Sequence, residues 1–484
     1  MSPNQLLYVC LDGLADDPIP ELGGLTPLEA ARTPNLDGLA GKGAQGLVYT
    51  VGPDIAPESD IAVFAILGYD PREDHPGRGV LEALGSGVEF HDGELAYRVN
   101  FATQEHGEIV DRRVGRDLPS ADAEALAADV NQRLRLPGAT FELRATVEHR
   151  GALVIRSKDG ALSANVSNTD PAYAKEGNLG VALATFENRA AEARPLDESE
   201  EAERAAELTN RFVEGSAAIL DSSAVNARRR SEGRLAANLL LIRDGGDHVP
   251  KLQPIEERFG PSWGCFVEMP VERGIALVLG MAPVDAPTGM ARTDQYTAWA
   301  ALAAEALGGY DALYIHIKGP DVPAHDGRAE DKRDVIEDID EAFFGELLPR
   351  IRTGRTVLAV TADHATSCLK KAHTADPVPL LVSGPRVAAD ATRVFGERAA
   401  SEGALGKLVG VAILLGPFVV GWGRLIAVGI HRRSGAVATL MVIVLAFAAS
   451  ASLSGDLPSA RPLFIFGMLA LKFGFAPSDG EKGL

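Results

Sequence analysis

Three short apolar segments, each followed at once by acidic or histidine side chains, constrain the fold of this chain more than any other feature. Leu6–Cys10 precedes Asp12, and the later segments 312–317 and 356–361 lead directly into polar loops. Segments that are apolar on both faces are typical of parallel strands covered by helices. Because ligands of open α/β sheets gather at the carboxyl ends of such strands, the pattern predicts an α/β core with a polar site at one edge.

The chain has 484 residues, which is long enough for two or more domains, and its patterning changes along its length. Residues 1–75 and 250–408 have α/β character, and we expect them to form one discontinuous domain. Residues 76–249 alternate strand-like pieces with Ala- and Glu-rich helices, which predicts an inserted α+β lobe. The expected strands are 5–11, 46–51, 95–101, 140–148, 152–156, 239–243, 312–317, 356–361 and 380–383, and the expected long helices are 58–67, 120–136 and 199–220.

Charge and cysteine content narrow the class of partner. The formal net charge of −20 argues against nucleic-acid binding and favours small-molecule or protein partners. The three cysteines lie far apart without a C-x-x-C pair, so neither a disulfide framework nor a thiolate zinc site is expected. A reducing, cytoplasmic location fits this pattern.

Imidazole and carboxylate side chains follow all three apolar strands, and they have the chemistry of metal ligands. The candidates are Asp12, Asp321, His325, Asp363, His364 and His373. The spacing of four between Asp321 and His325 places both on one side of a helical turn. Oxygen and nitrogen donors without thiolates favour zinc or manganese over copper(I) or iron–sulfur. Each residue alone also fits a cap or turn, and Asp363 in particular fits a helix N-cap.

Ser59 has two interpretations. It stands in Pro57-Glu58-Ser59-Asp60, at the beginning of an expected helix, where serine is a common N-cap. Alternatively, a metal and the helix N-terminus lower the pKa of its hydroxyl and make it a nucleophile toward phosphorus. The residues around it do not decide between these roles.

The motifs together resemble the cofactor-independent phosphoglycerate mutases, and in particular the archaeal-type branch of the alkaline phosphatase-like metalloenzyme superfamily. The similarity covers about residues 5 to 408 and includes motifs in the middle of the chain. The motifs are Asp12-Gly13, 33–37, Glu58-Ser59-Asp60, 77–83, 98–103, 111–116, 316–327, 361–364 and His373-Thr374.

The resemblance implies interconversion of 3-phosphoglycerate and 2-phosphoglycerate, in glycolysis and gluconeogenesis, through a phosphoserine at Ser59. It also implies two divalent metal ions, with Mn²⁺ expected first and Mg²⁺, Zn²⁺ or Co²⁺ as alternatives. One ion would be bound by Asp321, His325 and His373, and the other by Asp12, Asp363, His364 and Ser59.

The substrate carries a carboxylate and a phosphate, so the lobe should present guanidinium groups, which bind both. The substrate-binding candidates are Arg98, Asn100, Arg112, Arg116, Asp170, Arg243 and Lys318. Arg112 and Arg113 cannot both face one cleft if they lie on a strand. Two departures from the family pattern stand out: acidic residues follow Arg243, and Trp299 occupies the region where a lysine is expected.

Two other functions are compatible with this sequence. A metal-dependent phosphohydrolase of the same superfamily would pass phosphate from Ser59 to water instead of glycerate. The other function is that of an inactive membrane-attached scaffold. A site that has decayed should have lost at least one metal ligand, so the intact ligand set argues against this function.

The C-terminal segment departs most from the family. Residues 409–461 form an apolar insertion, and residues 462–484 resemble the family's final helix and tail. Within the insertion, residues 434–455 are uncharged and long enough to span a bilayer, with a basic flank at 431–433. The insertion is therefore interpreted as a membrane segment, a buried helical hairpin or a foreign insertion.

Overall fold

The computed structural model describes residues 5–410 except 178, 184 and 386. The predictions for the 434–455 membrane segment, for the 462–484 helix and for all but the first two residues of the 409–461 insertion therefore fall outside the described residues. Among the helices that are described, none has both the length and the hydropathy that a bilayer crossing requires.

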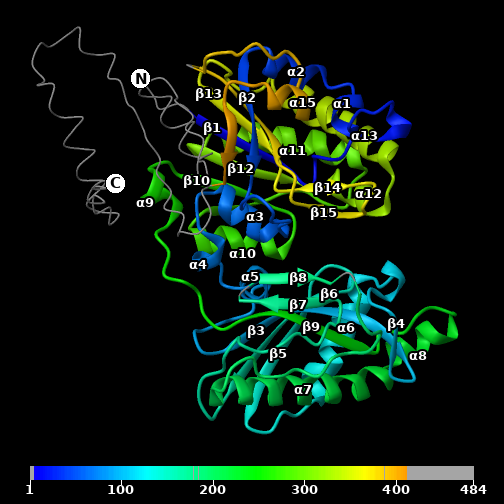
Figure 1. Ribbon diagram of the computed structural model, residues 1–484. Helices are drawn as coiled ribbons and strands as arrows, with labels where there is room; N and C mark the ends of the chain where they lie inside the picture. The colour runs from blue at the N-terminus through cyan, green and yellow to red at the C-terminus, as the bar shows by residue number, and fades with distance from the viewer. Residues whose placement is uncertain (1–4, 178, 184, 386, 411–484) are drawn as a thin grey trace, which may run out of the picture.

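An eight-stranded sheet forms the centre of the first lobe (Figure 1). Its spatial order is β11-β10-β12-β1-β13-β16-β2-β17, and only β16 runs antiparallel to its neighbours. The strands are β1 (Gln5–Leu11), β2 (Gly43–Tyr49), β10 (Trp263–Val267), β11 (Ala282–Asp285), β12 (Ala312–Ile317), β13 (Thr356–Thr361), β16 (Val378–Ser383) and β17 (Gly406–Val409). The predicted α/β core with a largely parallel sheet is therefore confirmed.

Helices cover this sheet, and α3 and α10 lie on the side toward the second lobe (Figure 1). The central strands are buried along their whole length, which explains their continuous apolar sequence. The helices of this lobe are α1 (Pro27–Ala30), α2 (Pro34–Ala40), α3 (Ser59–Ile66), α4 (Pro71–Asp74), α9 (Ile255–Phe259), α10 (Pro270–Leu279), α11 (Arg292–Ala306), α12 (Asp321–Asp326), α13 (Ala329–Asp338), α14 (Gly345–Leu347) and α15 (Glu397–Ser401).

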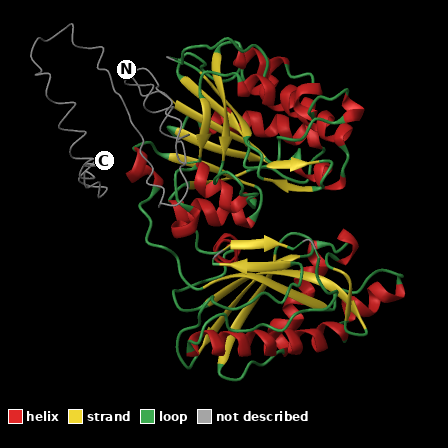
Figure 2. Ribbon diagram, in the orientation of Figure 1, coloured by secondary structure: helices red, strands yellow, loops and turns green. Residues whose placement is uncertain are grey.

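The second lobe is built on an antiparallel sheet, as Figure 2 shows, and matches the predicted α+β insertion. β3 is its central strand, with β4, β6 and β9 paired to it and β5 beyond β6. Helices α6 and α7 pack on one face and α5 on the other. The elements are α5 (Arg78–Gly85), β3 (Leu95–Glu105), β4 (Glu108–Asp111), α6 (Ser120–Arg133), β5 (Ala139–Ala145), β6 (Arg150–Ser157), β7 (Tyr173–Glu176), β8 (Leu179–Ala182), α7 (Glu200–Asp221), α8 (Ala224–Ser231) and β9 (Leu239–Gly246).

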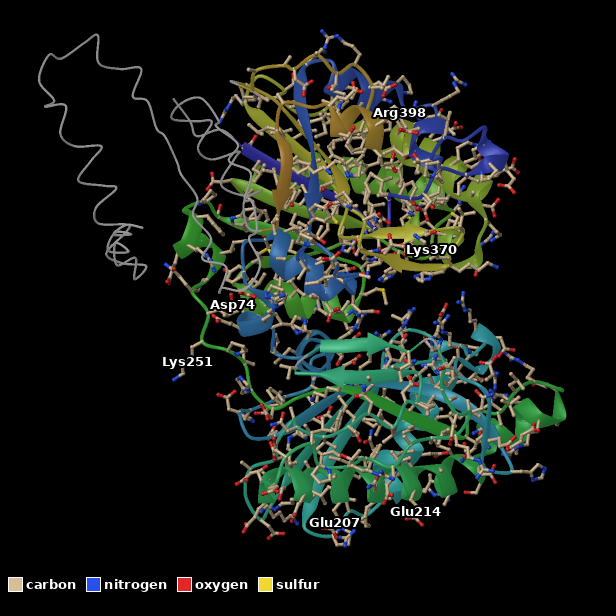
Figure 3. All side chains as sticks on the ribbon, in the orientation of Figure 1. Asp74, Glu207, Glu214, Lys251, Lys370 and Arg398 are labelled. Carbon is tan, nitrogen blue, oxygen red and sulfur yellow. The ribbon has the colours of Figure 1, made fainter. Side chains whose placement is uncertain are left out.

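Side chains separate by polarity around this lobe. Glu207 and Glu214 project from α7 on the face away from the first lobe (Figure 3). On β3 the residues alternate, so that Tyr97 and Val99 enter the core beneath α6 and α7 while Ala96 contacts α5. The period of two therefore assigns Arg98, two residues after Ala96, to the face that meets α5 and the first lobe.

Two local predictions need correction, and a third, made for the case of a strand, does not apply. The strand expected at 46–51 begins earlier, at Gly43, because residues 43–45 pair with β16. The helix expected from residue 58 has Glu58 as its N-cap and Ser59 as its first residue. Arg112 and Arg113 lie in a turn after β4, so the alternation that would separate them on a strand does not apply.

Candidate active site

The carboxyl ends of β1, β12 and β13 bring the predicted metal ligands together. These strands are neighbours and run parallel, so the loops that follow them share one edge of the sheet. Among the described residues, three groups of candidate donor atoms result, each with all its atoms within 4.8 Å of one another. The first group is Asp321, His325 and His373, and the second is Asp12, Asp363 and His364. The third, Cys10, His316 and Asp363, shares Asp363 with the second.

The hydrogen bonds of His325 and His373 show which ring nitrogens face the site. Nδ1 of His373 lies 2.9 Å from the carbonyl oxygen of Pro57, and Nδ1 of His325 lies 3.1 Å from that of Lys371. A carbonyl oxygen only accepts, so each Nδ1 carries the proton in the neutral ring and each Nε2 carries a lone pair. The two Nε2 atoms are 3.2 Å apart. Two lone pairs at that separation repel unless a cation lies between them.

His364 is held in the same way, through a hydroxyl. Thr366 Oγ1 donates to Asp321 Oδ1 at 2.7 Å, so it accepts from His364 Nδ1 at 3.0 Å. This orients His364 Nε2 toward Asp12 Oδ1 at 3.3 Å and Asp363 Oδ2 at 3.2 Å. Such support of the outer ring nitrogen is typical of metal-binding histidines.

The buried carboxylates complete an environment that requires positive charge. Asp12 Oδ1 and Asp363 Oδ2 are buried and accept no hydrogen bond. Burial, with Asp363 and Asp321 nearby, raises the pKa of Asp12 to about 7. Burial disfavours the charged form of His364, but Asp363 and Asp12 outweigh it and raise its pKa to about 10. A divalent cation would supply the charge that these protons otherwise bring, so the residues present fit divalent metal ions.

Ser59 is placed beside the second group of donors. Its Oγ lies 3.2 Å from His364 Nε2. It is the first residue of α3, so the N-cap role belongs to Glu58, and the N-terminal end of the helix favours negative charge on the serine oxygen. Asp363 does not cap a helix either, because it is followed by strand β14 (Ala365–Ser367).

The second lobe presents arginines on the face that meets the first lobe. Arg98 on β3 lies directly opposite Arg243 on β9, and Asn100 lies opposite Arg150 on β6. Like charges directly opposite each other destabilise a sheet. Burial, Arg243 and Arg78 lower the pKa of Arg98 to about 9. Arg98 Nε is a buried donor without a hydrogen-bond partner, which favours an anionic ligand. Asn100 Oδ1 is a buried acceptor without a partner, which favours a ligand group that donates, such as a hydroxyl.

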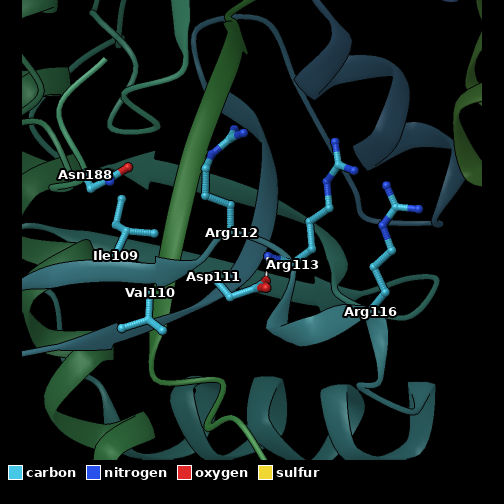
Figure 4. Close-up of a pocket in the computed structure, with 7 residues that line it drawn as sticks. All are labelled: Ile109, Val110, Asp111, Arg112, Arg113, Arg116 and Asn188. Atoms are coloured by element: carbon cyan, nitrogen blue, oxygen red, sulfur yellow. Dashed lines mark hydrogen bonds between the residues drawn. The ribbon is translucent and has the colours of Figure 1, made fainter. Parts of the chain in front are cut away.

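A second set of cations lines a cavity of about 400 Å³ after β4 (Figure 4). Arg112, Arg113 and Arg116 rise on the same side of their loop. Among them Arg112 is engaged, with both Nε and Nη2 donating to Asp170. Asp170 is fully buried and thus orients this guanidinium, which fits a supporting role better than contact with an anion.

Arg243, Lys318 and Trp299, which the sequence analysis also singled out, each contact other parts of the protein. Arg243 lies over the ring of Tyr173 at 3.5 Å and pairs with Asp244 at 3.4 Å, so one of the two acidic residues that follow Arg243 contacts it. Lys318 Nζ forms an ion pair with Glu272 Oε1 at 2.7 Å. Trp299 is a buried residue of α11 that donates to a backbone carbonyl, so it packs in the core instead of replacing a lysine at the site.

Sequence reasoning left several residues of this region without a role. His316 Nε2 lies 3.5 Å from Asp363 Oδ2, and Arg78 Nη1 lies 3.2 Å from Asp60 Oδ1. His149 is buried among arginines, and burial together with Arg150 and the neighbouring guanidinium groups lowers its pKa to about 3. His316 and Arg78 stand in motifs of the resemblance, but only the register and the packing show what they contact.

Known proteins match most of this chain. The family model for 2,3-bisphosphoglycerate-independent phosphoglycerate mutase matches residues 40–226. The enzyme of that name from Aeropyrum pernix is 43% identical over 414 residues, which are 84% of this chain and 96% of the relative. The Methanopyrus kandleri enzyme is 38% identical over 416 residues, covering 85% of this chain and 94% of the relative.

Two solved structures agree with the fold. A Pyrococcus horikoshii protein has a TM-score of 0.69 at 30% identity, covering 86% of this chain and 96% of that chain. The cofactor-independent phosphoglycerate mutase from Thermoplasma acidophilum has a TM-score of 0.57 at 32% identity, covering 85% of this chain and 98% of that chain. By the identity and coverage of these relatives, the chain belongs to the 2,3-bisphosphoglycerate-independent phosphoglycerate mutase family.

Proposed function

We propose that this protein interconverts 3-phosphoglycerate and 2-phosphoglycerate and that Ser59 carries the phosphoryl group between the two hydroxyls. The observation that carries the proposal is the position of Ser59 Oγ, 3.2 Å from His364 Nε2 and beside two groups of convergent carboxylate and imidazole donors. The relatives that share the fold and most of the chain length are named for this activity.

The proposed metal sites follow the two groups of donors. Asp321, His325 and His373 would bind one divalent ion, and Asp12, Asp363, His364 and Ser59 would bind the other, with Mn²⁺ as the proposed ion. When bound, such ions neutralise phosphoryl oxygens and lower the pKa of a serine hydroxyl.

The protein's own residues account for the rest of the reaction. The Ser59 hydroxyl gives up its proton, and its Oγ attacks phosphorus as the bond from phosphorus to the substrate's C3 oxygen breaks. That oxygen takes up a proton, which gives glycerate. Glycerate then reorients, its C2 hydroxyl gives up a proton, and the C2 oxygen attacks the phosphorus of phospho-Ser59 as the bond from phosphorus to Oγ breaks. Ser59 Oγ takes up a proton, so that each transfer releases one proton and consumes one. The N-terminal end of α3 stabilises the phosphoryl charge on Ser59.

The lobe arginines are proposed to hold glycerate between the two transfers. Arg98, Asn100 and Arg243 offer unpartnered or weakly paired polar atoms on the face toward Ser59, and a bidentate guanidinium suits the substrate carboxylate. Arg112 and Arg116 would widen this positive surface. We propose 76–249 as the substrate lobe and 1–75 with 250–408 as the catalytic domain. Exclusion of water by this lobe would keep phospho-Ser59 from hydrolysis.

The test supplies 3-phosphoglycerate and Mn²⁺ and measures 2-phosphoglycerate and free phosphate. We expect 2-phosphoglycerate from the wild-type protein, its loss in Ser59→Ala, and wild-type rates in the control Ser231→Ala, which changes an exposed serine. Activity retained in Ser59→Ala would refute the phosphoserine mechanism. Release of phosphate without 2-phosphoglycerate would identify a phosphohydrolase instead.

A further inference from the structure

The residues on both sides of Ser59 contact one guanidinium group. Arg78 Nη1 lies 3.2 Å from Asp60 Oδ1 and 3.9 Å from Glu58 Oε2. Its Nε lies 3.4 Å from Glu82 on its own helix. Arg78 therefore joins the residue before the nucleophile to the residue after it.

The start of α3 depends on such an external contact. Glu58 is the N-cap of this helix, but its side chain makes no capping hydrogen bond. An uncapped N-terminus leaves backbone N–H groups unsatisfied and frays readily. The contacts of Arg78 with Glu58 and Asp60 therefore stabilise the first turn of α3, which has no side-chain cap of its own.

Asp60 is fixed from a second direction. His75 Nδ1 accepts from the backbone N–H of Gly77 at 3.1 Å, so the proton of the neutral ring is on Nε2. His75 Nε2 then donates to Asp60 Oδ2 at 3.1 Å. With one carboxylate oxygen bound by His75 and the other by Arg78, Asp60 has no freedom to rotate.

Arg78 is itself held by close packing of α5 between the two lobes. A Cβ at Gly79 would lie 2.6 Å from the carbonyl carbon of Ala96 on β3, so α5 touches the substrate lobe through backbone. At the other end of the helix, a Cβ at Gly85 would lie 2.9 Å from the backbone nitrogen of Gly274 on α10. The glycines at both ends of α5 thus allow its backbone to pack closely against β3 of the second lobe and α10 of the first lobe.

We infer that Arg78 is a positioning residue, which holds Ser59 in line for phosphoryl transfer by binding the carboxylates of Glu58 and Asp60 from a helix fixed between the lobes. The inference rests on the proposed function of Ser59. It assigns Arg78 no contact with substrate. Because a small misplacement of a nucleophile costs about 10²-fold in rate, loss of this contact should act on kcat.

The experiment compares Arg78→Ala with the wild-type protein in the 3-phosphoglycerate assay with Mn²⁺. We expect kcat to fall about 100-fold with KM changed less than threefold, and the phosphorylation of Ser59, followed by intact mass, to slow in parallel. Added guanidinium ion should raise the kcat of Arg78→Ala at least tenfold. Arg72→Ala, which removes an exposed arginine nearby, should match wild type and show no rescue.

Three results would overturn the inference: an unchanged kcat, a tenfold rise in KM at constant kcat, or the absence of guanidinium rescue. If Arg78→Ala does not fold, Arg78→Lys decides, because it keeps the charge but cannot span both carboxylates. A tenfold loss of kcat at constant KM in that variant supports the inference, and wild-type kcat refutes it. The proposed function is tested separately, by the mutase activity of the wild-type protein and its loss in Ser59→Ala, neither of which depends on Arg78.

Discussion

Replacement of Gly274 by alanine tests whether the contact between α5 and α10 is as close as the structure indicates. Gly274 lies inside α10, and a Cβ there would lie 2.6 Å from the carbonyl carbon of Leu81 and 2.8 Å from its Cα. Both neighbours are backbone atoms of a buried helix, so neither can rotate away. The two helices must separate by roughly 1 Å to reach an ordinary van der Waals distance, which is about 3.5–4 Å between carbons.

Two opposing terms set the magnitude. Alanine in a helix interior is favoured over glycine by about 1 kcal/mol. Overpacking against fixed atoms costs about 1–3 kcal/mol, and the rigid neighbours here place the cost near the upper end. We therefore expect Gly274→Ala to lower the free energy of unfolding by about 2 kcal/mol, although helix propensity alone predicts a gain.

Equilibrium unfolding in urea, followed by far-UV circular dichroism, measures this change. Gly38→Ala is the matched control, because Gly38 is in α2 and a Cβ there meets no atom within 4 Å. We expect the control to raise the free energy of unfolding by about 0.5–1 kcal/mol. If Gly274→Ala stabilises the protein as Gly38→Ala does, the backbone contact between the lobes is not present in solution.

Two other predictions concern pH and metal. Burial raises the pKa of Glu397 from 4.5 to about 7, so the folded protein loses stability as pH rises between these values. Glu397→Gln mimics the protonated carboxyl. Its free energy of unfolding in urea should equal that of the wild type at pH 4.5 and exceed it by at most about 3 kcal/mol at pH 8. Equal free energies of unfolding at pH 8 would contradict the raised pKa. Chelation by EDTA should abolish mutase activity and lower Tm, and added Mn²⁺ should restore both, since the carboxylates of Asp12 and Asp363 then regain their counter-charge; an unchanged Tm would show that the donors bind no ion.

The sequence was sufficient to predict the strands of the core and to name the candidate metal ligands. Apolar runs such as Leu6–Cys10 are long enough only for short buried strands, and a polar residue directly after such a run must lie at the strand's carboxyl end. The same logic located Asp321 and Asp363, whereas His373 follows no strand end and is a candidate because of its imidazole, nine residues after His364. Local periodicity likewise predicted the long helices of the lobe, whose boundaries shift by three residues or fewer.

The tertiary structure decided the relations between segments far apart in the chain. Only strand pairing places Arg98 opposite Arg243, and only the packing of α5 brings Arg78 to the carboxylates beside Ser59. The hydrogen bonds that point His325 and His373 toward each other involve carbonyl groups from distant loops. Sequence patterns report on burial along one segment, because periodicity is a local property. The orientation of a side chain toward a partner is set by long-range packing, which no local pattern encodes.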